Sequence, residues 1–334
     1  MTTHFASAFD KNFVIRALAT YRSIVSSIPE AHFWFLCLDS ETRPMIEKFN
    51  LKNITCITVE EIGNSALLAT RKDRTNTEFA MTSKSNFLSY LFHSGKVKDN
   101  DLLILTDVDM IFYEPLREFI EKEKKNTQYS IFLTPHKFPK EKEKLIPEVG
   151  YYNGGFITFR INEVSKACID EWAGQCINWC YLWHDYEHGW HTDQMYIDKW
   201  KTDYPGALDL PDKGVNMGTW NIERFTITQN KNGEFFADED PVICYHFHGL
   251  KMYITKAGKI KAYPICIHNN EIYTDYITKL QKVQDEILKI DPQWKYGYAP
   301  HPGILRLIKQ IVWRKLGLTK YNISLPIKSQ IENR

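Results

Sequence analysis

The sequence lacks the features that mark several large classes of protein. None of its apolar runs approaches the roughly 20 residues that a membrane-spanning helix requires. Its seven cysteines include no C-x-x-C pair, which argues against a disulfide framework and for a reducing compartment. The first ten residues carry neither a basic region nor an apolar segment, so no secretory signal is expected. These absences predict a cytoplasmic protein, either free or at the inner face of the membrane.

The sequence also lacks a charge excess and a known phosphate-binding loop. Its 42 basic and 41 acidic residues leave a formal net charge of +1, so no global field favours nucleic acid as a partner. Neither G-x-G-x-x-G nor G-x-x-x-x-G-K-[ST] occurs. The dinucleotide fingerprint and the P-loop are therefore both excluded.

Strand-like and helix-like segments alternate through the first half of the chain. Buried strands are expected at residues 3–9, 32–38, 54–59 and 102–105, and helices at 11–27, 41–49 and 82–93. This alternation predicts an α/β fold with a Rossmann-like, mostly parallel central sheet and helices on its faces. The composition shifts near residue 270, which suggests a main domain over 1–270 and a helical C-terminal extension over 271–334.

Two acids follow the apolar strand at residues 102–105. Asp107 and Asp109 would emerge at the carboxyl end of that strand, where ligands bind in open α/β sheets. Two carboxylates there could hold Mn²⁺ or Mg²⁺ against a substrate phosphate. The alternative is a solvated turn in which one of the acids caps the following segment.

Two further stretches suggest a site. Gly154 and Gly155 stand just before a strand, so the backbone there turns tightly or approaches something closely, a ligand being one candidate. His246 and His248 follow another apolar strand, and Lys251 comes three residues later; an imidazole could join the two carboxylates around Mn²⁺. Alternation along a strand puts both histidines on one face, so the sequence does not choose between them.

Two other groups of polar residues have a structural explanation. A long helix is expected at 163–183, followed by a second at 192–200 with Thr192 as its N-cap. Four residues in and just after the first helix recur every fourth position and could suggest zinc, although one straight helix cannot surround a tetrahedral ion: Cys176, Cys180, His184 and His188. The cysteines are better explained as core residues, and Asp193 as a helix-capping acid.

The motifs in this order resemble the metal-dependent, sugar-nucleotide-using glycosyltransferases of the GT-A fold. The resemblance is closest to glycosyltransferase family 8 and to related bacterial surface-polysaccharide transferases, and it covers roughly residues 3–251. It rests on four short motifs: D-x-D at 107–109, N-G-G at 153–155, D-Q at 193–194 and H-x-H-G-x-K at 246–251. Each motif alone is weak, but four in the right order are strong.

The resemblance implies a role for individual residues. It places Asp107, Asp109 and His246 around the metal ion. It places Asp193 and Gln194 beside the anomeric carbon as the catalytic pair. The donor-binding residues that it implies are Ala8, Asp10, Asn12, Lys84, Val108, Asn153, Gly155 and Lys251. Lys251 lies two residues after the glycine, where the family more often has three, so its place at the diphosphate is the least secure.

The hypothesis that follows is transfer of a hexose from a UDP-sugar to a hydroxyl of a glycan or lipid-linked acceptor, with retention implied by the resemblance alone. Two alternatives remain open. One is a nucleotidyltransferase acting on sugar phosphates, although residues 7–16 lack a glycine-rich basic loop. The other is a non-catalytic carbohydrate-binding protein that stacks sugars on its aromatic side chains, among them Trp179, Trp183, Trp190 and Trp220.

A basic amphipathic helix is expected at residues 304–316. Its apolar face could lie on an anionic membrane surface, which would suit a lipid-linked acceptor, or could pack on the main domain. The sequence supports both alternatives equally. Peripheral membrane contact through 303–317 is therefore an open expectation.

Overall fold

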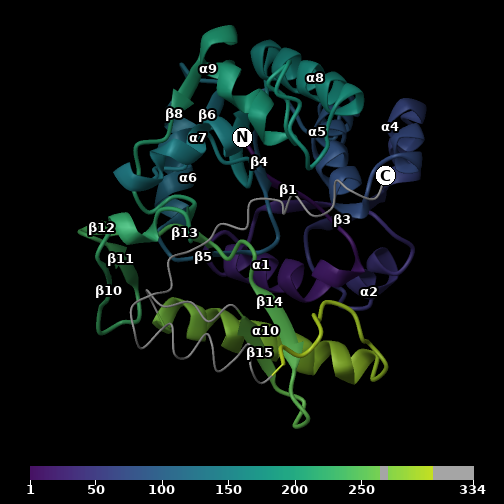
Figure 1. The fold of residues 1–334 in the computed structure, drawn as a ribbon, viewed down its shortest axis with the longest axis vertical. Helices are drawn as coiled ribbons and strands as arrows, with labels where there is room; N and C mark the ends of the chain where they lie inside the picture. The colour runs from purple at the N-terminus through teal and green to yellow at the C-terminus, as the bar shows by residue number, and fades with distance from the viewer. Residues whose placement is uncertain (264–269, 304–334) are drawn as a thin grey trace.

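A seven-stranded sheet between two layers of helices organises the computed structural model, which describes residues 1–263 and 270–303 (Figure 1). The strand order is β3-β2-β1-β4-β7-β6-β8. The strands are β1 (Thr3–Phe9), β2 (His32–Cys37), β3 (Ile54–Thr58), β4 (Leu102–Thr106), β6 (Ile131–Leu133), β7 (Phe156–Arg160) and β8 (Ala207–Asp209). Only β7 runs antiparallel to its neighbours, so the predicted mostly parallel sheet is confirmed.

Strand β4 shows why the sheet has a core on each face. Leu102 and Ile104 belong to one buried cluster, and Leu103 and Leu105 belong to the other. Successive side chains of a strand point to opposite faces, so only an uninterrupted apolar run suits a strand that is covered on both sides. The sequence of β4 therefore determines its central, doubly buried position.

Among the described residues, four long helices cover the sheet. One face carries α1 (Val14–Ser27) and α6 (Leu116–Lys125), and the other carries α5 (Asn76–His93) and α8 (Glu163–Asn178), which pack side by side (Figure 1). A fifth long helix, α10 (Asn270–Ile290), belongs to the same buried cluster as α1. The helix expected after residue 270 is α10. It packs on α1, and Arg22 forms an ion pair with Glu286 between the two helices. Its apolar face thus shares the core of the central sheet, while the division at residue 270 stays a prediction.

The remaining strands and helices of the described residues are short. Three small sheets contain β5 (Met110–Phe112), β13 (Cys244–His246) and β9 (Met217–Gly218); β10 (Ile227–Gln229), β11 (Phe235–Ala237) and β12 (Asp240–Pro241); and β14 (Lys251–Ile254) with β15 (Ile260–Tyr263). The short helices are η1 (Lys11–Phe13), α2 (Thr42–Glu47), α3 (Val59–Ile62), α4 (Ser65–Ala69), η2 (Thr70–Lys72), η3 (Lys140–Leu145), α7 (Ile146–Val149), η4 (Gln194–Lys199), α9 (Trp200–Asp203) and η5 (Ile222–Arg224).

Two predicted helix boundaries were wrong. Helix α5 begins at Asn76 and not at residue 82, because Thr75 and Glu78 form a reciprocal capping box. Helix α8 ends at Asn178 and not at residue 183, because Trp179 has an extended backbone and its ring packs on neighbouring aromatic side chains. Tertiary packing there outweighs helix propensity.

The predicted second helix also differs from the structure. It is replaced by the 3₁₀ helix η4 and the short α9. Thr192 has a left-handed backbone (φ +52°), and neither Thr192 nor Asp193 makes a side-chain capping bond. Asp193 is therefore not a helix cap, and its burial needs another explanation.

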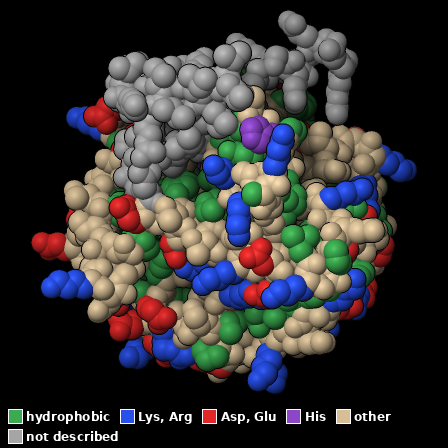
Figure 2. All heavy atoms as spheres, turned by 90° about the horizontal axis from the view of Figure 1, so that it is seen from below, with side chains coloured by type: hydrophobic (Ala, Val, Ile, Leu, Met, Phe, Trp, Pro, Cys, Tyr) green, Lys and Arg blue, Asp and Glu red, His purple; other side chains and the backbone are tan. Residues whose placement is uncertain are grey.

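The face formed by α10 and the β14–β15 hairpin bears charges of both signs. Figure 2 shows lysine and arginine interspersed with aspartate and glutamate over the visible part of this face. Within 1–263 and 270–303, no helix has the length and hydropathy needed to cross a membrane. The helix expected at 304–316 lies outside the described residues, so membrane contact there stays a prediction.

Candidate functional site

The D-x-D segment lies in the turn that joins β4 to β5, and hydrogen bonds from three sides fix its backbone. The amide of Asp107 donates to the carbonyl of Gly155 (2.9 Å). Thr20 in α1 donates its hydroxyl to the carbonyl of Val108 (2.7 Å), and Ser7 in β1 donates to the end of β4. The two carboxylates therefore project from a rigid turn at the carboxyl edge of the sheet, as predicted.

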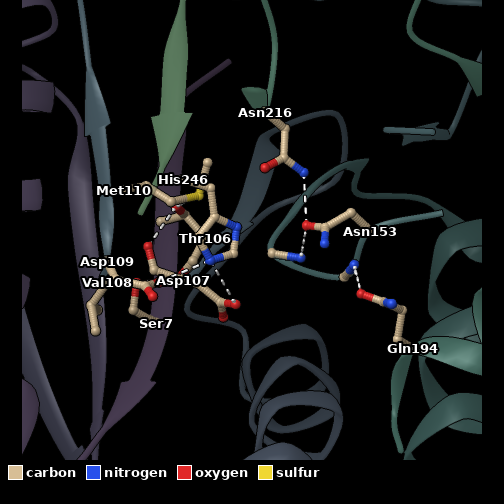
Figure 3. Close-up of polar contacts among 12 residues, drawn as sticks. Ser7, Thr106, Asp107, Val108, Asp109, Met110, Asn153, Gln194, Asn216 and His246 are labelled. Carbon is tan, nitrogen blue, oxygen red and sulfur yellow. Dashed lines mark hydrogen bonds and ion pairs between the residues drawn. The ribbon is translucent and has the colours of Figure 1, made fainter. Parts of the chain in front are cut away.

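Strand β13 brings His246 to the same place. It pairs antiparallel with β5, and the amide of Phe247 donates to the carbonyl of Asp109 (2.8 Å). The Nε2 of His246 then lies 3.0 Å from Oδ1 of Asp109 and 3.9 Å from Oδ2 of Asp107 (Figure 3). His246, which is far from Asp107 and Asp109 in the sequence, thus lies next to both of them.

The residues present fit a divalent metal ion. Ligand atoms of Asp109, His246 and His248 all lie within 4.8 Å of one another, the one such group found among the described residues. His246 is 2% exposed, and both of its ring nitrogens lack a hydrogen-bond partner that meets normal geometry. Carboxylate oxygen suits Mg²⁺ and Mn²⁺, and imidazole nitrogen suits Zn²⁺ and related ions, so this donor set fits a divalent ion without selecting one. Because both histidines reach this point, either can serve as a ligand.

His246 and Asp109 shift each other's pKa. Burial opposes ionisation of both partners, but the neighbouring His246 outweighs it and lowers the pKa of Asp109. Likewise, burial lowers the pKa of His246, but Asp109 outweighs it and raises that pKa above the usual value. The raised pKa favours a proton on His246 beside Asp109, and a metal ion bound to both side chains would compete with that proton.

Lys84 in α5 lies between the acidic turn, which carries Asp107 and Asp109, and the D-Q segment at residues 193–194. Its ammonium lies 2.6 Å from Oδ1 of Asp107 and 3.9 Å from Oδ2 of Asp193. Burial alone would lower the pKa of Lys84, but the two carboxylates outweigh it and raise the pKa. For Asp193, burial raises the pKa, and Lys84 offsets only part of that rise. The ammonium of Lys84 thus offsets part of the negative charge of Asp107 and Asp193.

Asp193 carries an unsatisfied oxygen. The residue is 4% exposed, and within the described residues its Oδ2 accepts no hydrogen bond. A buried carboxylate oxygen without a donor is costly, so such an atom calls for an explanation. A ligand hydroxyl that donates to Oδ2 would supply one.

Unlike the Oδ2 atom of Asp193, both polar ends of the Gln194 side chain are hydrogen-bonded. Its amide oxygen accepts from the amide of Gly154 (2.8 Å), and its amide nitrogen donates to the carbonyl of Val149 (2.6 Å) (Figure 3). Both polar ends therefore hold the backbone of the segment that leads into β7. In this structure Gln194 positions the glycine pair.

Gly155 is required by the close approach of protein side chains. A Cβ built at this position would lie 2.6 Å from Cε1 of His246 and 2.9 Å from Oδ1 of Asn153. The sequence predicted a close approach there and left a ligand as one candidate. The structure shows that the neighbours are the histidine and the asparagine.

Asn153 belongs to a buried polar network that the sequence analysis missed. Its Oδ1 accepts from the amide of Gly155 (3.0 Å) and from Nδ2 of Asn216 (2.8 Å), and its Nδ2 lies 3.3 Å from Nε2 of His136. Burial lowers the pKa of His136 to about 4, so this imidazole is neutral. Trp220 packs edge-on to both His136 and His246. Asn216 has a left-handed backbone, but that signal is visible only in the structure.

Several predicted donor-binding residues are not in contact with this cluster. Asp10 caps η1 and accepts from the amide and side chain of Asn12, which is exposed. Ala8 pairs with β2 next to them, at the carboxyl edge that β1 shares with β4. Lys251 is exposed at the start of β14. The roles of these residues stay predictions.

The cysteine and histidine series at 176–188 does not form a metal site. Cys176 and Cys180 are fully buried, and α8 ends between them. Their explanation as core residues is confirmed, because both belong to the cluster on the α5 side of the sheet. Core packing accounts for the spacing of the two cysteines.

Comparisons with known proteins agree with this architecture. No protein-family model matches the chain. Two uncharacterized proteins of Bacillus subtilis strain 168 are each 26% identical to it: YfnD over 308 residues (91% of this chain, 96% of YfnD) and YfnF over 311 residues (90% and 98%).

Solved structures show the fold. The galactosyltransferase LgtC, in complex with donor and acceptor sugar analogs, superposes with a TM-score of 0.54 at 15% identity, covering 84% of this chain and 95% of LgtC. The glycosyltransferase GlyE of Streptococcus pneumoniae TIGR4 superposes with a TM-score of 0.50 at 10% identity, covering 90% and 66%. The protein therefore has the GT-A fold of glycosyltransferases.

Proposed function

We propose that this protein is a metal-dependent glycosyltransferase that moves a hexose from a nucleotide sugar, a UDP-sugar, to a hydroxyl of a glycan or lipid-linked acceptor. The observation that carries the proposal is the convergence of Asp109, His246 and His248 next to Asp107 and the buried Asp193. Ion ligands and a sugar-facing carboxylate are what a diphosphate-linked donor requires. The GT-A fold supports the same reaction class.

In this proposal Asp107, Asp109 and His246 hold Mn²⁺, which would neutralise the charge that develops on the departing diphosphate. His248 is an additional candidate ligand. Lys84 pairs with Asp107 and holds its carboxylate in place. Lys251, Ala8, Asp10, Asn12 and Val108 would contact the diphosphate, nucleobase and ribose, as the family resemblance implies.

The donor sugar would lie between the acidic turn and the D-Q segment. Asp193 would accept a hydrogen bond from a sugar hydroxyl through its unsatisfied Oδ2. Gln194 would act by holding Gly154 and the Asn153 segment against the sugar. Asn153 and Gly155 would form the wall of this pocket beside His246.

The test is Mn²⁺-dependent release of UDP by the purified protein from a panel of UDP-sugars, with water or an added sugar as acceptor. Asp109→Asn removes the carboxylate that pairs with His246 and is expected to abolish both Mn²⁺ binding and turnover. Undiminished turnover in this variant would refute the metal role. NMR of the product's anomeric proton tests retention of configuration.

Two other activities remain distinguishable. A nucleotidyltransferase would release diphosphate from UTP and a sugar phosphate, and would release no UDP from a UDP-sugar. A non-catalytic carbohydrate-binding protein would bind glycans without Mn²⁺-dependent affinity for UDP. Calorimetry with UDP, with and without Mn²⁺, separates the latter case from the proposed one.

A further inference from the structure

Between α8 and η4 the chain forms a compact excursion at residues 179–191, here called the aromatic hairpin. Asp185 and Trp190 form an antiparallel bridge with hydrogen bonds of 2.9 and 3.1 Å. The carboxylate of Asp185 accepts from the amides of Glu187 and His188, and Gly189 takes the left-handed backbone (φ +69°) that closes the turn. The hairpin therefore has a defined shape, although the sequence predicted part of it as helix.

Two groups of packed rings, one edge-to-face and one stacked, support exposed aromatic side chains on this hairpin. Trp179 packs against Trp183 with ring centroids 4.4 Å apart. Tyr186 stacks on His184 (5.1 Å), which stacks on His191 (3.9 Å). Trp183 is 46% exposed and Tyr186 is 79% exposed. The rings are thus held in place from beneath while presenting apolar surface to solvent.

The hairpin is anchored to the segments that carry the proposed sugar site. At its base the amide of Thr192, next to Asp193, donates to the carbonyl of Tyr181 (3.0 Å). On one side the amide of Leu182 donates to Glu78 of α5, the helix that carries Lys84 (2.9 Å).

On the other side Nε2 of His184 lies 2.8 Å from the carbonyl of Glu148. The next residue, Val149, accepts the side-chain hydrogen bond of Gln194. Both sides of the hairpin are therefore bonded to the surroundings of Asp193 and Gln194.

We propose that the aromatic hairpin binds the acceptor, and that the acceptor is an oligosaccharide. This inference rests on the proposed function. Large, rigid aromatic rings provide contact area at little entropic cost, and exposed apolar surface rimmed by polar groups marks binding sites. Trp183 and Tyr186 present ring faces to the C–H faces of sugar residues, and Asp185, Glu187 and His188 lie beside them to bind hydroxyls. Trp183 and Tyr186 belong to different groups of packed rings, so the proposed ligand is a saccharide of more than one sugar unit.

The experiment measures binding of four hexasaccharides, built from glucose, galactose, mannose or N-acetylglucosamine, by saturation-transfer NMR and calorimetry. We expect at least one to bind the wild-type protein, and the double variant Trp183→Ala/Tyr186→Ala to bind it about tenfold or more weakly, as loss of aromatic anchors typically does. Trp183→Phe/Tyr186→Phe keeps the rings and should retain most of the affinity. Ile290→Ala, an exposed apolar side chain at the end of α10, is the matched control and should change nothing.

A second measurement needs no variant. Oxidation of Trp183 by N-bromosuccinimide, read by mass spectrometry of the peptide, should slow when the bound hexasaccharide is present. Absence of protection overturns the inference, as does unchanged binding by the Ala double variant. Failure of the wild-type protein to bind all four glycans while it binds UDP with Mn²⁺ overturns it as well.

The inference and the proposed function fail in different ways. Mn²⁺-dependent UDP binding should be the same in the wild-type protein and the Ala double variant. If the wild-type protein shows no such binding, the proposed function fails. If the double variant loses co-sedimentation with phosphatidylglycerol vesicles but keeps glycan binding, the hairpin contacts a membrane and not an acceptor saccharide, which overturns the inference.

Discussion

Replacing Gly155 by alanine tests the geometry of the metal site most directly. The added Cβ would lie 2.6 Å from Cε1 and 2.8 Å from Nδ1 of His246, whereas contacts of at least 3.4 Å are ordinary. The imidazole must therefore move away by most of an ångström, out of its 3.0 Å pairing with Asp109. Overpacking a tight interior typically costs about 1–3 kcal/mol of unfolding free energy.

The expected result is a lower melting temperature together with a loss of Mn²⁺ affinity of about tenfold or more, since ion ligands tolerate little displacement. Urea denaturation measures the first effect, and titration followed by electron paramagnetic resonance measures the second. Gly174→Ala is the matched control. This glycine lies in α8 with nothing within 4 Å of the added Cβ, so the substitution should raise stability by about 0.5–1 kcal/mol and leave Mn²⁺ binding unchanged. A Gly155→Ala protein as stable as wild type, with the same Mn²⁺ affinity, would refute the reasoning.

Three further outcomes follow from the charges and hydrogen bonds of the site. Lys84→Met removes the cation that pairs with the buried Asp193 and the partly exposed Asp107, so urea denaturation should show a loss of about 3 kcal/mol, the lower end for a buried pair, partly restored by Mn²⁺ at Asp107; equal losses with and without Mn²⁺ would contradict this. Burial raises the pKa of Asp193. Its side chain therefore adds to the free energy of unfolding below the unfolded pKa of about 3.9, and this contribution is lost as pH rises through the folded pKa. Asp193→Asn should therefore melt higher than wild type without ligand, by a margin that grows between pH 4 and pH 7, yet lose sugar transfer; a margin that does not change with pH would argue against this ionisation. Gln194→Ala removes two hydrogen bonds and should cost about 1–3 kcal/mol and reduce kcat, while an unaltered kcat would show that Gly154 needs no such support.

Much of the fold could be predicted from local sequence. The strand at residues 3–9 was predicted with the bounds that β1 has, and the apolar run of β4 predicted a strand buried on both faces. Such predictions succeed because periodicity reflects burial directly. The start of α5 was also within reach, because T-x-x-E at residues 75–78 is a helix-start signal that was overlooked.

Other features could not be predicted, because contacts between distant segments decide them. Helix α8 ends early where Trp179 and its aromatic neighbours pack together in the hairpin. Gln194 turns both polar ends toward backbone groups, which no reading of a D-Q pair would indicate. Asn216 joins Asn153 only because the chain brings β9 beside β13.

The sequence by itself determined that two acids end a buried central strand and that a histidine strand and a glycine pair accompany them. Strand period and the common carboxyl edge of parallel strands carry that information. Only the tertiary structure decided that His246 and His248 both reach Asp109, that Lys84 bridges Asp107 and Asp193, and that Gly155 makes room for the histidine. These are distances between residues far apart in the chain, and they are determined by strand pairing and core packing and not by local pattern.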